Sequence, residues 1–189
     1  MTTLIELAEY RTYRLDDDIH HKPGNDLRMA PHGLCILADI PFQMDGIIQL
    51  SSTVSHEKTG EVFPDSVVGI AIDATSKRMH FLQSASWHDE NGSVIGEYRV
   101  HYADGDVATI PIVYGHSVVD WWFMKGDPLP TAAPIAWNGA NERTQDLGHL
   151  IQLYAFTWMN PRPDEPIATL DFVSLGAESA PFLMAVTLD

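Results

Sequence analysis

The residues "YRVHYADGDVATIPIVYGHSVVDWW" (98–122) contain two runs of alternating residues around a short polar turn, followed by two adjacent tryptophans. In the first run, Tyr98, Val100 and Tyr102 would lie on one face of a β-strand, with the charged or polar residues between them on the other face. The second run alternates in the same way. This stretch therefore predicts two strands, each with one face toward a core.

The turn between the two runs determines how they pair. A three-residue loop that ends at Gly105 pairs Tyr98 with Ile110 and Val100 with Ala108, which keeps the apolar face continuous. A two-residue turn would instead place a charged residue beside that face. The three-residue loop needs a left-handed residue at its last position, and a glycine stands there. We therefore predict a β-hairpin with a glycine bulge at Gly105.

Similar short runs recur along the whole chain. Its 12 prolines and 13 glycines separate apolar runs of strand length, a rhythm typical of all-β proteins. Pro111 lacks an amide hydrogen, so its strand should lie at a sheet edge or a bulge. We predict an antiparallel two-sheet β-sandwich or jelly roll, with strands at 34–38, 47–51, 67–72, 79–84, 94–102, 107–114, 151–158, 167–174 and 182–188.

We expect residues 1–189 to form a single β-sandwich domain. Residues 1–30 are predicted to be an N-terminal extension or an edge strand, and "TLIELAEYRTYRL" (3–15) suits a helix or a strand equally well. Residues 124–147 contain little that resembles a strand, and a loop of that length in a compact domain is usually functional or disordered.

The charge and the cysteine content exclude several classes of protein. A net charge of −15 argues against partners that present phosphates, which are nucleic acids and anionic membrane surfaces. The single cysteine, Cys35, allows no internal disulfide and suits a buried apolar position. The N-terminal residues lack the pattern of a signal peptide, and no run approaches the ~20 apolar residues of a membrane span, so we expect a cytoplasmic protein.

The loop at 124–147 and the tryptophans before it are the predicted ligand site. Carbohydrates are bound by flat aromatic faces together with amide, carboxylate and guanidinium groups. The predicted function is therefore a non-catalytic module that binds a carbohydrate or another small molecule. Neighbouring residues of a strand point to opposite faces, so at most one residue of the tryptophan pair should be exposed. The expected ligand-binding residues are Trp121, Trp122, Trp137, Asn138, Asn141, Glu142 and Arg143.

The alternative function is a small enzyme (an isomerase, cyclase or lyase) that acts on a sugar or a secondary metabolite. Histidine works as a general acid or base near neutral pH with little tuning. No G-x-S-x-G motif indicates a serine nucleophile. The catalytic candidates near the long loop are His116, Asp120, His149 and His88.

The sequence predicts no cofactor. None of the histidines shows the spacing of a zinc site. Calcium remains open as a structural ion, because the loop carboxylates of "DDD" (16–18) and "DEPIATLD" (164–171) are the ligand type it prefers. A third hypothesis is a homo-oligomer that buries the apolar run "DWWFM" (120–124).

Several blocks of the sequence resemble a family. The blocks "ILADIPFQMDGIIQLSS" (36–52), "MHFLQSASW" (79–87), the opening stretch, "IAWNGAN" (135–141) and "LYAFTWMNPRPDEPIATLDFVSLGAESAPFLMAVTL" (153–188) look like a galactose-binding-like jelly-roll module of bacterial proteins. Modules of this kind often accompany glycoside hydrolases. The resemblance covers most of the chain from Leu34 to Leu188, and it implies a β-sandwich fold and sugar binding.

Overall fold

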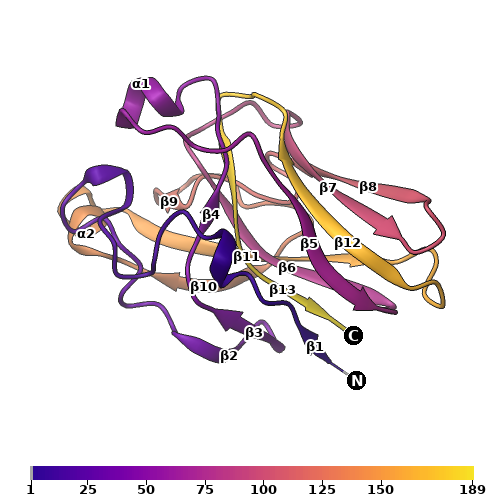
Figure 1. Ribbon diagram of the computed structural model, residues 1–189. Coiled ribbons are helices and arrows are strands. Elements are labelled where there is room, and N and C mark those ends of the chain that lie inside the picture. The colour runs from indigo at the N-terminus through magenta and orange to yellow at the C-terminus, as the bar shows by residue number, and fades with distance from the viewer. Residues whose placement is uncertain (1) are drawn as a thin grey trace.

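The computed structural model describes residues 2–189, which form two large antiparallel sheets and a small hairpin (Figure 1). The larger sheet has the strand order β1-β13-β6-β11-β10, with β4 beside β13 and β9 beside β11. Its strands are β1 (Thr3–Leu4), β4 (Ile48–Gln49), β6 (Arg78–Ser86), β9 (Trp122–Phe123), β10 (Ile135–Gly139), β11 (Leu150–Met159) and β13 (Ala180–Leu188).

The smaller sheet has the order β5-β12-β7-β8 and contains the predicted hairpin. In it, Tyr98 pairs with Ile110 and Val100 pairs with Ala108, and Gly105 has a φ of 96°, so the predicted register and loop are confirmed. Because β8 is the outer strand, Pro111 lies at a sheet edge, as predicted. The strands of this sheet are β5 (Ser66–Ala74), β7 (Val94–Tyr102), β8 (Val107–Val113) and β12 (Ile167–Ser174).

The two sheets pack through an aromatic stack. The ring of Phe81 on β6 lies 4.1 Å from that of Tyr98 on β7, which stacks in turn on Phe172 of β12 at 5.1 Å. The buried Tyr98 hydroxyl donates a hydrogen bond to Gln83 Oε1 at 2.6 Å, so this core leaves no polar group of the tyrosine unpaired. The predicted all-β sandwich is confirmed.

A second apolar cluster covers the other face of the larger sheet. Leu82, the neighbour of Phe81, points into it together with Phe182, Phe42 and Trp121. The hairpin of β2 (Gly33–Leu37) and β3 (Ile40–Met44) supplies part of this cover. The larger sheet is therefore buried on both faces, which explains why β6 and β13 are almost continuously apolar or buried.

Two regions without a clear sequence pattern, 3–15 and 124–147, each contain a short strand and a short helical segment. Residues 3–15 form the edge strand β1 and a 3-10 turn, η1 (Ala8–Tyr10), rather than one long element. The segment 124–147, predicted as a long loop, contains both β10 and α2 (Glu142–Leu147), so its irregular part ends at residue 134. Two further turns are η2 (Ile19–His21) and α1 (Ser55–Thr59).

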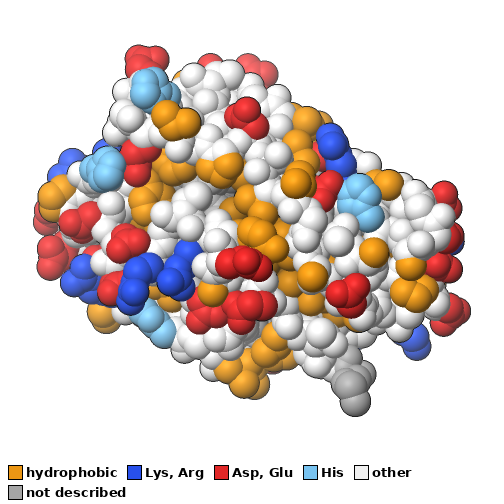
Figure 2. Space-filling view, in the orientation of Figure 1, with side chains coloured by type: hydrophobic (Ala, Val, Ile, Leu, Met, Phe, Trp, Pro, Cys, Tyr) orange, Lys and Arg blue, Asp and Glu red, His pale blue; other side chains and the backbone are white. Residues whose placement is uncertain are grey.

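The acidic side chains on the surface are distributed as the spread of acidic residues along the sequence suggests. Acidic side chains are scattered over the visible face rather than gathered in one patch (Figure 2). Within residues 2–189, no helix is long and apolar enough to cross a membrane.

Candidate functional site

A cavity of about 280 Å³ opens beside β9. Four connections meet there: those that follow β6, β8 and β9, and the one that precedes β11. The lining residues are His88, Tyr114, Val119, Asp120, Trp122, Phe123, Met124, Asp127, Pro128 and His149. We refer to this cavity as the Trp122 cleft.

The backbone of residues 120–122 decides which side chains reach the cleft. The Trp121 amide donates to Ala85 O at 2.8 Å, and Trp121 O accepts from the Gln152 amide at 2.9 Å. These bonds hold the segment between β6 and β11 and leave the Trp121 side chain only 3% exposed in the core. Because neighbouring residues of an extended chain point to opposite sides, Asp120 and Trp122 face the cleft.

The Trp122 ring forms one wall of the cleft and is held in a defined orientation. It is half-buried, and its indole N–H donates to Oδ1 of the buried Asn25 at 3.2 Å. The His149 ring meets it edge to face, with the ring centroids 6.1 Å apart. The cleft therefore has a preorganised aromatic wall of the kind that small-molecule sites use.

Asp120 supplies the less exposed of the two carboxyl groups that line the cleft. Its Oδ1 accepts the Trp122 amide hydrogen at 3.0 Å. Burial raises the pKa of Asp120 to about 7, although hydrogen bonds from the amides of Trp122 and Trp87 favour the ionised form. The charge of Asp127 also raises this pKa, and the charge of Lys58 lowers it. Asp120 can therefore exchange a proton near neutral pH.

A tyrosine and a histidine stand next to this carboxyl group. The Tyr114 hydroxyl accepts the Asp120 amide hydrogen at 3.2 Å and lies 3.2 Å from His88 Nδ1. Burial raises the pKa of Tyr114 to about 12, so the hydroxyl keeps its proton and can donate it in the bond to Nδ1. A neutral His88 then carries its own proton on Nε2.

His149 contributes an unusual buried atom. Its Nδ1 is buried and has no hydrogen-bond partner among the described residues. Buried polar atoms are nearly always paired, so an exception at the lining of a cavity points to a role that the folded chain alone does not satisfy.

A smaller hollow of about 100 Å³ adjoins the cleft, since Asp120 and Trp122 line both. Its other lining residues are His20, Lys22, Asn25, Trp87 and Trp121. The rings of His20 and Trp87 stack there at 5.0 Å. Both residues have positive φ angles, 60° and 71°, which are unfavourable for residues other than glycine and are concentrated at functional sites.

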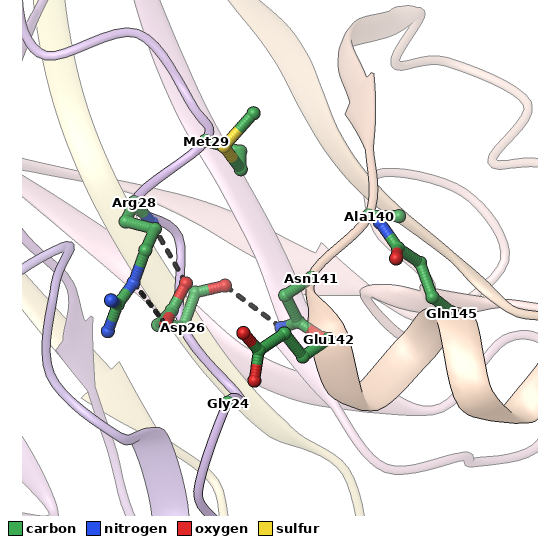
Figure 3. Close-up of a pocket in the computed structure, with 8 residues that line it drawn as sticks. All are labelled: Gly24, Asp26, Arg28, Met29, Ala140, Asn141, Glu142 and Gln145. Carbon is green, nitrogen blue, oxygen red and sulfur yellow. Dashed lines mark hydrogen bonds and ion pairs between the residues drawn. The ribbon is translucent and has the colours of Figure 1, made fainter.

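A third hollow, also of about 280 Å³, lies where α2 meets the segment 24–29. We refer to it as the Asn141 hollow. Its buried polar groups bond to their neighbours, as Figure 3 shows: Arg28 pairs with Asp26 at 2.6 Å, and Asn141 Nδ2 donates to Asp26 O at 2.9 Å, whereas Glu142 and Gln145 are exposed. The Asn141 side chain also caps α2 by accepting the Thr144 amide hydrogen. This hollow therefore serves as a joint between two segments of the chain.

The structure separates the residues that the sequence grouped as ligand-binding. Trp122 lines the cleft, and Trp121 belongs to the core. The ring of Trp137 lies over Gly139 and packs against the cluster beneath the β2–β3 hairpin, so it faces none of the three hollows. The remaining four lie at or near α2: Asn141 and Glu142 line the Asn141 hollow, Asn138 bonds to Gln152, and Arg143 is exposed.

The four candidates for acid–base chemistry are grouped more closely. His88, Asp120 and His149 line one cleft although they come from distant parts of the sequence. His116 does not join them: it is exposed on the turn after β8, where its Nδ1 lies 3.0 Å from Thr131 Oγ1.

Sequence reasoning missed Tyr114, Trp87, His20 and Lys22. Nothing in the sequence pattern connects Trp87 to His20, because their contact depends on how the N-terminal segment lies across the larger sheet. For Tyr114, the nearest signal in the sequence was the "DWW" motif (120–122), which begins six residues later.

Within residues 2–189, no group of three or more histidine, cysteine or acidic side chains is arranged to hold a metal ion. No protein-family model matches the chain, and no curated protein is significantly similar to it in sequence.

Proposed function

We propose that this protein binds a small polar molecule, a carbohydrate or a compound of similar chemistry, in the Trp122 cleft. The observation that carries the proposal is the convergence of an aromatic wall, a carboxyl group and two imidazoles on one cavity. Ligand sites are typically apolar cavities with a few convergent polar groups, and groups with shifted pKa values are concentrated in them.

The cavity limits the size of the ligand. About 280 Å³ lies just below the ~300–1,000 Å³ range of small-molecule sites. The cleft therefore suits one sugar ring rather than an extended oligosaccharide. Trp122 would cover the apolar C–H face of the ring, and Asp120, His88 and His149 would bond to its hydroxyl groups. The resemblance to galactose-binding-like modules supports the same ligand class.

Thermal unfolding with a panel of monosaccharides tests the proposal. A ligand that binds only the folded state stabilises it by ~2.7 kcal/mol at a concentration of 100 times Kd, which raises the Tm of a domain of this size by roughly 5–10 °C. We expect one class of monosaccharide to raise the Tm in a dose-dependent way, and Trp122→Ala to abolish that rise. If no member of the panel changes the Tm, the proposal fails.

A second candidate function is acid–base catalysis on the bound sugar, as in an isomerase. It is favoured by the position of Asp120 beside the Tyr114–His88 pair, together with the pKa of about 7 of its carboxyl group. An ionised Asp120 could take the proton from a carbon next to a carbonyl group while His88 Nε2–H donates to the carbonyl oxygen.

Proton NMR in D₂O separates binding from this catalysis. An isomerase would replace the C2 hydrogen of an aldose with deuterium, and Asp120→Asn would stop the exchange without unfolding the protein. A sugar that binds but keeps its C2 hydrogen would identify the protein as a binding module.

A further inference from the structure

The smaller hollow beside the cleft has a different chemical character from the cleft itself. The cleft holds acidic Asp120 and Asp127 between its aromatic walls, whereas Lys22 lines the hollow. Lys58, on α1, places its Nζ 6.0 Å from the centroid of the Trp87 ring, which also lines the hollow. Lys22 therefore lies in the lining of the hollow, and the exposed Lys58 lies outside the lining beside one of its aromatic rings.

These two lysines have no partner of opposite charge. Among the described residues, no carboxylate oxygen lies within ion-pairing distance of either Lys22 or Lys58. The other two lysines, Lys77 and Lys125, also form no ion pair among the described residues, so the position of Lys22 and Lys58 beside the hollow is what distinguishes them. In a chain with a net charge of −15, two uncompensated cations at one cavity create a local field that favours an anion.

The backbone around the hollow is held in an unfavourable conformation. His20 and Trp87 both have left-handed φ angles, and His20 Nε2 is bonded to Oε1 of the buried Gln49 at 2.9 Å. Burial lowers the pKa of His20, which keeps its ring neutral and suited to stacking on Trp87. The stacked pair therefore forms a neutral aromatic wall of the hollow rather than a further positive charge.

We propose that this hollow holds the anionic group, a carboxylate or a phosphate, of an acidic sugar whose ring lies against Trp122 in the adjoining cleft. The inference rests on the proposed function, because the hollow and the cleft share Asp120 and Trp122. A space of about 100 Å³ can hold a few water molecules, and therefore a single carboxylate or phosphate group. Lys22, which lines the hollow, supplies a charge-assisted hydrogen bond to that group, and Lys58 adds a positive charge beside the Trp87 ring.

Asp120 does not prevent an anion from binding beside it. Burial already raises the pKa of this carboxyl group to about 7, so it can take up a proton when an anion arrives. The neutral carboxyl group then donates a hydrogen bond instead of repelling the ligand.

Isothermal titration calorimetry with matched neutral and acidic sugars tests the inference. The probes are glucose and galactose, their uronates, and their 6-phosphates. We expect one acidic form to bind at least about tenfold more tightly than its neutral parent, a change typical of one charge-assisted bond. The uronate and phosphate arms show which anionic group the hollow accepts.

Three glutamine variants locate the anion. Lys22→Gln and Lys58→Gln should each weaken binding of the acidic sugar severalfold, and should leave the affinity for the neutral parent unchanged. Lys77→Gln is the matched control, because Lys77 is an exposed lysine in the turn between β5 and β6. It should change neither affinity.

The outcomes separate this inference from the proposed function. Equal affinities for the neutral and acidic sugars would overturn the inference and leave the proposed function standing. Tight binding of an acidic sugar that survives both Lys22→Gln and Lys58→Gln would also overturn it. If none of the six probes binds, the inference and the proposed function both fail.

Discussion

The Trp122 cleft and the Asn141 hollow have the same volume of about 280 Å³, but their polar groups are used differently. In the Asn141 hollow, Asp26 forms an ion pair with Arg28. The Asn141 side chain donates a hydrogen bond from Nδ2 to the backbone oxygen of Asp26, and its Oδ1 accepts the Thr144 amide hydrogen that caps α2. In the Trp122 cleft, Asp120 has a strongly raised pKa and His149 Nδ1 has no partner.

Cavity size alone therefore does not distinguish a binding site from a structural joint. A hollow whose polar groups already satisfy one another gains little from a ligand, because the ligand would have to break existing bonds. A hollow with a carboxyl group that has no cation partner gains hydrogen bonds when a ligand enters. On this basis we propose that the cleft binds the ligand and that the Asn141 hollow contributes to stability.

The largest expected effect concerns the carboxyl group of the cleft. The pKa of Asp120 is about 7 in the folded state and ~3.9 in an unfolded chain. Between these values the folded state binds more protons, so the contribution of Asp120 to stability is greatest at low pH and is lost as the pH rises through 7. Asp120→Asn keeps an oxygen for the Trp122 amide but cannot ionise.

Urea unfolding at pH 5 and pH 8 measures this contribution. We expect the free energy of unfolding of the wild type, relative to Asp120→Asn, to fall by about 2–3 kcal/mol over that interval. The comparison between the two proteins cancels the titration of groups such as His20. Parallel pH profiles would show that Asp120 ionises normally and would remove the main contrast between the two hollows.

The second prediction concerns the Asn141 hollow. Asn141→Ala removes the cap of α2, leaves the backbone oxygen of Asp26 without a partner, and removes one of the two hydrogen bonds to Asn25 Oδ1. We expect a loss of about 2 kcal/mol in stability, seen as a Tm lowered by roughly 4–8 °C. Asn141→Ser, which can still cap the helix, should recover part of the loss. Ligand affinity should stay within twofold in both variants, and a larger change would extend the binding site to this hollow.

The third prediction compares two half-buried tryptophans. Trp122→Ala should weaken binding of the sugar that most raises the Tm by at least about tenfold, because it removes the aromatic wall of the cleft. Trp137→Ala should lower stability through lost packing and leave that affinity unchanged, since Trp137 packs over Gly139. Calorimetry on the folded variants measures both affinities, and the reverse pattern would move the site to β10.

The smallest expected effect comes from an exposed carboxylate at the rim of the Asn141 hollow. Glu142→Gln should change stability by less than about 0.5 kcal/mol, as surface substitutions usually do, and should not change ligand affinity. A substantial loss of binding in this variant would contradict the assignment of the hollow to a structural role.

The sequence predicted the strands well because the two-residue period of β7 and β8 and the turn at Gly105 are local signals. It missed β3 because the connection from β2 turns at Ala38 and Asp39, which both have positive φ angles without the glycine that usually marks such a turn. It missed β10 because "IAWNG" stands in a segment rich in turn residues.

The site was predicted less completely than the fold. The acid–base candidates His88, Asp120 and His149 were identified from their residue types, and the fold brings them together. Trp137 was proposed for its aromatic ring, but its packing depends on the close approach of Gly139 and on the β2–β3 hairpin, which no local pattern reveals. Long-range contacts of this kind decide whether an aromatic residue belongs to a core or to a site.

The most direct test of the central claim is a titration of ¹⁵N-labelled protein with glucose, galactose and their uronates, followed through the indole N–H signals. The chain has five tryptophans, and phenylalanine variants assign the five signals. The Trp122 and Trp87 signals should shift in a saturable way with at least one of these sugars, while the Trp137 and Trp158 signals stay in place. Shifts confined to Trp137 or Trp158, or no shift of any signal, would contradict ligand binding in the Trp122 cleft.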